Sequence, residues 1–192
     1  MHFNKLGLRV LGIAESFAQL DKYSTLAGVV MRGDMVIDGI CLSKNLVGGN
    51  NSTSSILRLY RALARNDINI LMLSGCIISY YNIVDIDLLA SKADRPVICL
   101  TYKESEGIED TIRFKFPLDK KKIELYRKLG GRKKIALRTG KNVLVRLSRI
   151  SEKDALRILN QFTLQGSIPE PVRVAKLIAK SVRRYYPKDA MD

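Results

Sequence analysis

Histidine and cysteine are scarce in this chain of 192 residues, which has one histidine and three cysteines. The histidine, His2, lies at the amino terminus, which argues against Ser-His and Cys-His nucleophilic pairs and against histidine-rich metal sites. Cys41, Cys76 and Cys99 are widely spaced in apolar runs, a pattern that predicts neither a disulfide framework nor a zinc knuckle. Any catalysis must then use carboxylate, lysine, tyrosine or cysteine side chains, and we expect a reducing compartment.

Long apolar runs are also lacking. No run reaches the roughly 20 residues that a membrane-spanning helix needs. The amino-terminal segment does not combine a basic start, an apolar core and a small-residue cleavage site, as a signal peptide does. We therefore expect a cytoplasmic protein that has no membrane partner.

Acidic residues are few relative to basic ones. The 33 lysines and arginines outnumber the 19 aspartates and glutamates, which gives a formal net charge of +14. Such an excess favours a polyanionic partner, either nucleic acid or an anionic membrane surface. A need for solubility, without any such partner, explains the same excess. The hydrophobic content of 46% is enough to bury a substantial core. The distribution of the cations must decide between these explanations.

Apolar runs and turn signals in residues 1–102 predict an α/β core. Three strands form an antiparallel meander, whose first hairpin loop is Arg32-Gly33-Asp34. A helix capped by Ser52 or Thr53 and a second helix then connect two buried strands, which gives a mixed sheet with parallel strands at its centre. This is the outline of a ribonuclease H-like fold with flanking helices. The predicted strands span residues 8–13, 26–31, 35–42, 68–73 and 96–102, and the second helix spans residues 83–90.

Residues 103–192 are strongly basic and predict a helical and hairpin elaboration of that core within a single domain, residues 1–192. Asp119 can cap a helix that ends at Gly130-Gly131, and residues 135–137 and 143–147 predict a hairpin. Ser151 can cap the next helix, and the last helix begins near Pro169. The cations of the first helix and the segment that follows it are Lys120, Lys121, Arg132, Lys133 and Lys134.

A stripe of cations also follows one face of the last predicted helix. Arg173, Lys176, Lys180 and Arg183 recur at spacings of three and four residues, which places them along one side. Such a stripe can lie along phosphates, although a solvated helix face explains the same spacing. Together with the cluster at residues 120–134, the stripe predicts a surface that binds DNA or RNA.

Four motifs resemble those of one family. They are SIPEPVRVAKLIA at residues 167–179, LGI at 11–13, LSG at 73–75 and NIVDI at 82–86. In this order they resemble the archaeal endonuclease V-like family that is labelled endonuclease dU, over nearly the whole chain. The resemblance implies a ribonuclease H-like core whose strand-end carboxylates hold Mg²⁺ for hydrolysis of a phosphodiester next to a deaminated base.

The chain departs from the family pattern at three acidic positions, where it carries Ala14, Asn51 and Ser74. Each lost carboxylate removes negative charge that would offset the dehydration of Mg²⁺. Glu15 follows the first position, but it can reach the same metal only if the chain leaves regular β geometry there. The three losses predict weak metal affinity.

Three acids nevertheless remain as catalytic candidates, namely Glu15, Asp38 and Asp85. Of these, Glu15 and Asp85 are the candidate metal ligands. A solvated strand position explains Asp38 equally, and a helix cap explains Asp85. Two hypotheses therefore stand. The chain is a metal-dependent endonuclease that acts near damaged or deaminated bases in DNA repair, or it is a catalytically inactive protein that binds nucleic acid or another protein.

Overall fold

The computed structural model of the protein describes residues 7–18, 20–102 and 107–185. Seven strands form one sheet in the order β3-β2-β1-β4-β7-β9-β8. The strands of this sheet are β1 (Arg9–Ser16), β2 (Tyr23–Arg32), β3 (Ile37–Leu46), β4 (Ile70–Leu73), β7 (Val97–Thr101), β8 (Lys133–Ala136) and β9 (Asn142–Ser148). A small second sheet consists of β5 (Ile77–Ile78) and β6 (Asn82–Ile83).

The predicted topology is confirmed. Strands β1, β2 and β3 form the antiparallel meander. Strand β4 lies between β1 and β7 and pairs parallel with both. The sheet is mixed and has the ribonuclease H-like order at its centre. The hairpin of β8 and β9 continues the same sheet, because β9 pairs antiparallel with β7.

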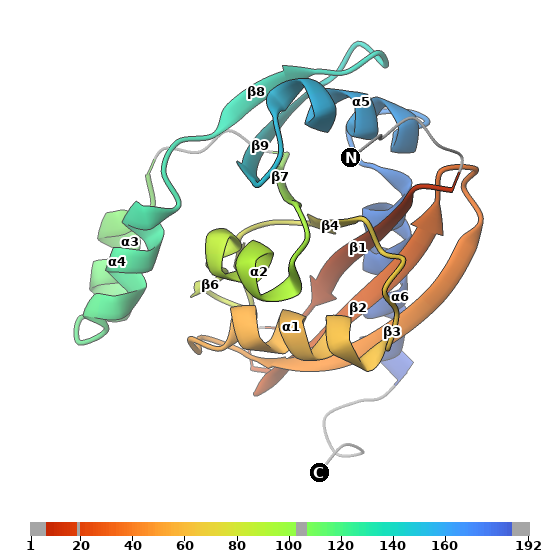
Figure 1. Cartoon of the computed structure of the whole chain (residues 1–192). Helices are drawn as coiled ribbons and strands as arrows, with labels where there is room; N and C mark the ends of the chain where they lie inside the picture. Colours follow the sequence, from red (N-terminus) through yellow and green to blue (C-terminus); the bar gives the residue numbers. More distant parts are fainter. Residues whose placement is uncertain (1–6, 19, 103–106, 186–192) are drawn as a thin grey trace.

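Helices cover both faces of the sheet (Figure 1). On one face α1 lies against β2 and β3, and α2 lies against β7 and β9. On the other face α6 lies against β1 and β2, and α5 packs in one core cluster with β4, β7 and β9. The pair of α3 and α4 lies beyond the sheet, beside α2 (Figure 1). The helices are α1 (Ser52–Ala62), α2 (Ile86–Ala93), α3 (Glu109–Lys115), α4 (Lys120–Lys128), α5 (Glu152–Phe162) and α6 (Glu170–Tyr185).

Side-chain caps begin three of these helices; Asp119 and Ser151 were predicted as caps, and for Asp85 a cap was one of two explanations. Asp119 accepts a hydrogen bond from the Lys122 amide at 3.1 Å, and Ser151 accepts one from the Asp154 amide at 3.1 Å. The prediction for α1 was wrong, because Asn51 is its N-cap residue and no side-chain cap bond forms there. The second helix begins at residue 86 rather than 83, because residues 82–83 pair with β5 and Asp85 caps α2.

The start of α6 lies very close to β1. A Cβ atom on Gly12 would lie 2.3 Å from the carbonyl carbon of Pro171, so only glycine fits at this point. Two residues further along β1, the buried Ala14 packs with Val29 and with Ala175, which lies one turn further along α6. The small side chains of β1 therefore let α6 lie directly on the sheet.

The structure joins Cys76 and Cys99 by a disulfide, which corrects the expectation from the sequence. The two residues are 23 positions apart, but Cys99 lies beside Leu73 in the pairing of β4 with β7. Parallel pairing thus brings together cysteines whose spacing gave no sign of a bridge. The inference of a reducing compartment loses its basis. Within the described residues, no helix is both long enough and apolar enough to span a membrane.

Candidate nucleic-acid interface at the ends of the parallel strands

Two of the three substituted acidic positions meet at the carboxyl ends of β1 and β4. Ile13 pairs with Leu73, so Ala14 and Ser74 are the next residues on two adjacent strands. The Ser74 amide donates a hydrogen bond to the Ile13 carbonyl oxygen at 2.9 Å. Because carboxyl ends of parallel strands share one edge of a sheet, the family's site would lie here. In this chain the edge carries a methyl group and a hydroxyl group.

Glu15 points to the opposite face of the sheet from Ala14. It remains in regular β pairing with Leu26, so the chain does not leave β geometry at this residue. Its carboxylate accepts a hydrogen bond from the Ser79 amide at 2.6 Å and a second from the Ser79 hydroxyl. Burial raises the pKa of Glu15, and the Ser79 hydrogen bonds offset part of that rise. Both carboxylate oxygens of Glu15 thus accept hydrogen bonds from the β5–β6 turn.

The β5–β6 turn is strained without any glycine. Ser79, Tyr80 and Tyr81 have φ angles of 44°, 58° and 61°, which is left-handed backbone that side chains with a Cβ rarely adopt. Each such residue costs roughly 1–2 kcal/mol. The bonds from Ser79 to Glu15 hold the first of the three in place. The turn presents Tyr80 and Tyr81, which pack edge to face with each other and with Phe116.

A buried polar network extends from Ser79 to the third substituted position. The Asn45 amide donates to Ser79 Oγ at 2.7 Å and to Ser52 Oγ at 2.9 Å. The Asn82 amide then donates to Asn51 Oδ1 at 2.9 Å. The Asn51 amide donates in turn to Ser55 Oγ at 3.2 Å. Both ends of Asn51 therefore have neutral protein partners.

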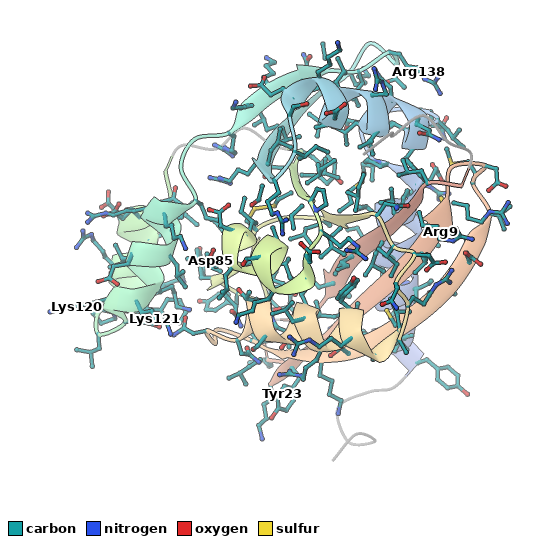
Figure 2. The ribbon with its side chains drawn as sticks, in the orientation of Figure 1. Arg9, Tyr23, Asp85, Lys120, Lys121 and Arg138 are labelled. Atoms are coloured by element: carbon teal, nitrogen blue, oxygen red, sulfur yellow. A yellow bond between two sulfur atoms is a disulfide. The ribbon has the colours of Figure 1, made fainter. Side chains whose placement is uncertain are left out.

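Asp85 and Asp38 have structural partners of their own. Partial burial raises the pKa of Asp85, but the Lys128 ammonium at 2.7 Å and the Leu88 amide outweigh that effect and lower it. Hydrogen bonds from Arg9 at 2.6 Å and Arg65 at 2.7 Å lower the pKa of Asp38. Figure 2 shows that Arg9, the partner of Asp38, and Asp85 lie in different parts of the molecule.

The predicted acids do not converge. Six positions of β1 separate Arg9, the partner of Asp38, from Glu15, which is about 20 Å at the rise of a strand. Across the described ranges, no group of three histidine, cysteine, aspartate or glutamate side chains is placed to hold a metal ion. The side chains present at the family's site do not fit Mg²⁺, because they offer a methyl group, a hydroxyl and a neutral amide that already has protein partners.

A pocket of about 450 Å³ opens beside Ser74, at the ends of β4 and β7. It lies between the ends of β4 and β7, strand β9 and α6, and among the described residues that line it there is no carboxylate. The polar residues that line it include Ser74, Tyr102, Tyr126, Arg132, Arg146 and Lys176. The pocket therefore gathers three cations beside Ser74, which is one of the three substituted acidic positions.

Two guanidinium groups, those of Arg132 and Arg146, lie near each other in this pocket. Burial lowers the pKa of Arg146, and the nearby charge of Arg132 lowers it further. The Arg146 Nε atom donates to the Gly130 carbonyl oxygen at 3.1 Å. Burial also raises the pKa of Tyr102 above its usual range, and the Ser74 side chain offsets part of that rise. The cavity is thus lined by two guanidinium groups, which bind anions such as phosphate through paired hydrogen bonds.

The structure places the predicted cations in three settings. Arg132 and Lys176 line the pocket, while Lys120, Lys121, Lys134 and Lys180 are exposed on the surface. The others form ion pairs, Lys133 with Glu152, Arg173 with Glu170 and Arg183 with Asp21. The stripe on α6 is thus partly neutralised by acids of the chain.

Sequence reasoning missed Arg146 and Tyr102 as pocket residues. Arg146 stands within the run VLVRL at residues 143–147, and one charged residue in an otherwise apolar strand was the available signal. Tyr102 directly follows the last residue of β7, so its position at a strand end could have indicated the same edge. Neither residue belongs to a cationic cluster in the sequence.

Known proteins resemble the chain over most of its length. The UPF0215 protein of Pyrobaculum aerophilum is 38% identical over 176 residues, which cover 91% of this chain and 94% of the relative. The crystal structure of an Archaeoglobus fulgidus protein of unknown function has a TM-score of 0.75 at 22% identity, and it covers 91% of this chain and 98% of that chain.

A more distant likeness extends to endonuclease V. Ciona intestinalis Endonuclease V, solved in complex with DNA that contains an inosine, has a TM-score of 0.64 at 15% identity and covers 93% of this chain and 87% of that chain. At this identity the likeness establishes the ribonuclease H-like fold. The model of the family described as Endonuclease dU matches residues 6–183. The chain therefore belongs to the endonuclease dU family, an archaeal family that is endonuclease V-like.

Proposed function

We propose that this protein binds nucleic acid and holds a backbone phosphate in the pocket beside Ser74. The observation that carries the proposal is the pocket itself, in which Arg132, Arg146 and Lys176 gather at the ends of the parallel strands. The fold likeness to Endonuclease V bound to inosine-containing DNA supports a nucleic-acid ligand. The formal net charge of +14 adds a general attraction for polyanions.

The residues of the pocket suit a phosphodiester. Guanidinium groups donate paired hydrogen bonds to phosphate oxygens, and the Lys176 ammonium adds a point charge. The Ser74 hydroxyl can donate one more hydrogen bond. The rings of Tyr102 and Tyr126 form part of the same wall and offer apolar surface to a sugar or a base. The chain's own residues thus bind and orient a strand, and this function needs no metal.

Cleavage beside a damaged or deaminated base, with Mg²⁺ as cofactor, is the second candidate. The family membership and the likeness to Endonuclease V favour it. The positions Ala14, Asn51 and Ser74 oppose it, because they remove the carboxylates that would neutralise the metal. A labelled panel of DNA and RNA, intact or carrying uracil or hypoxanthine, separates the two candidates. Cuts that need Mg²⁺ or Mn²⁺ and stop with EDTA would overturn the binding-only function.

Lys176→Ala is expected to weaken the affinity for single-stranded DNA about tenfold, since a phosphate contact of this kind is worth about 1–3 kcal/mol. Because one fewer counterion is released on binding, the slope of log affinity against log salt should fall by about one. Fluorescence anisotropy of a labelled oligonucleotide over a salt series measures both quantities.

Lys153→Ala is the matched control, because it removes the same charge from an exposed position on α5. Its salt slope and affinity should stay close to those of the unchanged protein. Equal losses in the two variants would show that only net charge matters, and the pocket would then not be the binding site.

A further inference from the structure

The hairpin of α3 and α4 carries two unusually exposed apolar side chains. Phe114 at the end of α3 is 86% exposed, and Leu118 in the connection to α4 is 95% exposed. These are the highest exposures among the large apolar residues of the described ranges. The hairpin extends away from the sheet (Figure 1). Large apolar groups at such a point indicate a surface that contacts a partner.

The tip of this hairpin, where α3 connects to α4, is anchored to other parts of the chain, so the exposure of Phe114 and Leu118 is a fixed feature. Lys122 is fully buried, and its ammonium donates to the Gly49 carbonyl and to Asn50 Oδ1, each at 2.8 Å, and to the Tyr81 carbonyl at 3.0 Å. Asp119 accepts a hydrogen bond from the Asn50 amide at 2.6 Å. The anchor keeps the side chains of Phe114 and Leu118 exposed to solvent, although burial of such apolar side chains is energetically favourable.

The charges around the tip indicate the kind of partner. Lys115, Lys120 and Lys121 are exposed within a few residues of the two apolar side chains, and Figure 2 shows Lys120 and Lys121 at the lower end of the α3–α4 pair. Lys115 also donates to the Tyr80 hydroxyl at 2.9 Å, which links the tip to the tyrosine turn. Apolar side chains between cations match a nucleic acid, in which stacked bases lie between phosphates.

The hairpin is also continuous with the phosphate pocket. Ile108, which precedes α3, and Tyr126 of α4 line that pocket, and Tyr126 Oη accepts a hydrogen bond from the Ile108 amide at 3.1 Å. Helix α4 has 9 residues, which is about 13 Å of helix and about the length of four base steps. A strand that enters the pocket can follow α4 to the tip.

We propose that Phe114 and Leu118 form a wedge that inserts between neighbouring bases of a bound nucleic acid, with Lys115, Lys120 and Lys121 on the flanking phosphates. The inference rests on the proposed nucleic-acid function, but it assigns a second surface and a mode of contact. Inserted apolar side chains unstack a base step at a cost of a few kcal/mol, which the added protein contacts offset. The wedge thus locally opens the stack near the pocket.

The double variant Phe114→Ala, Leu118→Ala tests the wedge in the full-length chain. The probe is an oligonucleotide duplex that contains 2-aminopurine, whose fluorescence rises when its neighbours unstack. The unchanged protein is expected to raise that fluorescence, and the double variant is expected to abolish the rise and to bind about tenfold more weakly, as loss of base stacking worth about 1–3 kcal/mol implies. Its salt slope should not change, because no cation is removed.

Leu164→Ala is the matched control, since Leu164 is 59% exposed and follows α5. It should leave the fluorescence rise intact. If the unchanged protein binds but the double variant gives the same affinity and fluorescence, the wedge is wrong and the proposed function stands. Absence of binding by the unchanged protein overturns both. Loss of binding to anionic phosphatidylserine vesicles in the double variant, with DNA binding unaltered, would assign the tip to a lipid surface instead.

Discussion

Lys122→Met is expected to lower the free energy of unfolding by about 4 kcal/mol. The substitution keeps the length of the side chain but leaves the Gly49 and Tyr81 carbonyls and Asn50 Oδ1 without their donor. A buried acceptor without a partner costs about 1–3 kcal/mol, and the relief of burying a charge offsets part of the sum. Urea unfolding followed by circular dichroism measures the change.

The neighbouring Lys121→Met is a matched control, because Lys121 is exposed on the same helix. We expect this change to shift the stability by about 0.5 kcal/mol or less. Amide hydrogen exchange should show faster opening of residues 109–128 in the Lys122 variant alone. Equal unfolding midpoints for the two variants would mean that the anchor contributes nothing.

Glu15→Ala is expected to destabilise the fold by about 3 kcal/mol, because Ser79 loses the acceptor of both its amide and its hydroxyl. The left-handed turn of residues 79–81 would then lack the contact that holds its first residue. Glu15→Gln keeps an acceptor and should retain most of the stability at neutral pH. Thermal unfolding of the two variants, compared with the unchanged protein, measures the difference.

The stability of the unchanged protein should also depend on the ionisation of Glu15. Burial raises the folded-state pKa of this carboxyl above its ordinary value of 4.5. The free energy of unfolding that the protonated Glu15 side chain contributes is therefore fully present below pH 4.5. It declines as the pH rises through the folded-state pKa. In Glu15→Gln that decline should disappear. A variant with the same pH profile as the unchanged protein would show that Glu15 is not buried in the way described.

The core strands were predictable because their apolar runs reflect burial on both faces of the sheet. The run at residues 68–73 contains β4, and the run at 96–102 contains β7. Asp119 and Ser151 were predictable as caps since a cap acts on amides two or three residues away. The Cys76–Cys99 bridge was not, because only the pairing of β4 with β7 brings the two residues together.

The site was harder to predict since its contacts join residues far apart in the sequence. Glu15 and Ser79 are 64 positions apart, and Arg183 and its partner Asp21 are 162 apart. Periodicity therefore placed Arg183 on an outer helix face but could not show that an acid neutralises it. The Ser79 turn has no glycine to indicate left-handed backbone. Lys122 follows two exposed lysines, so composition gave no sign of its burial.

The close approach of Pro171 to Gly12 has a consequence for how the chain is made. Helix α6 is the last helix described, yet it packs on β1, the first strand, and fills the space above Ala14. During synthesis the first strands leave the ribosome long before the helix that covers them. The apolar side of β1 and β2 then stays exposed to solvent until about 160 further residues have been translated. At roughly 5–20 residues per second, this takes several seconds or more. A premature stop before residue 170 would leave that side permanently open to aggregation.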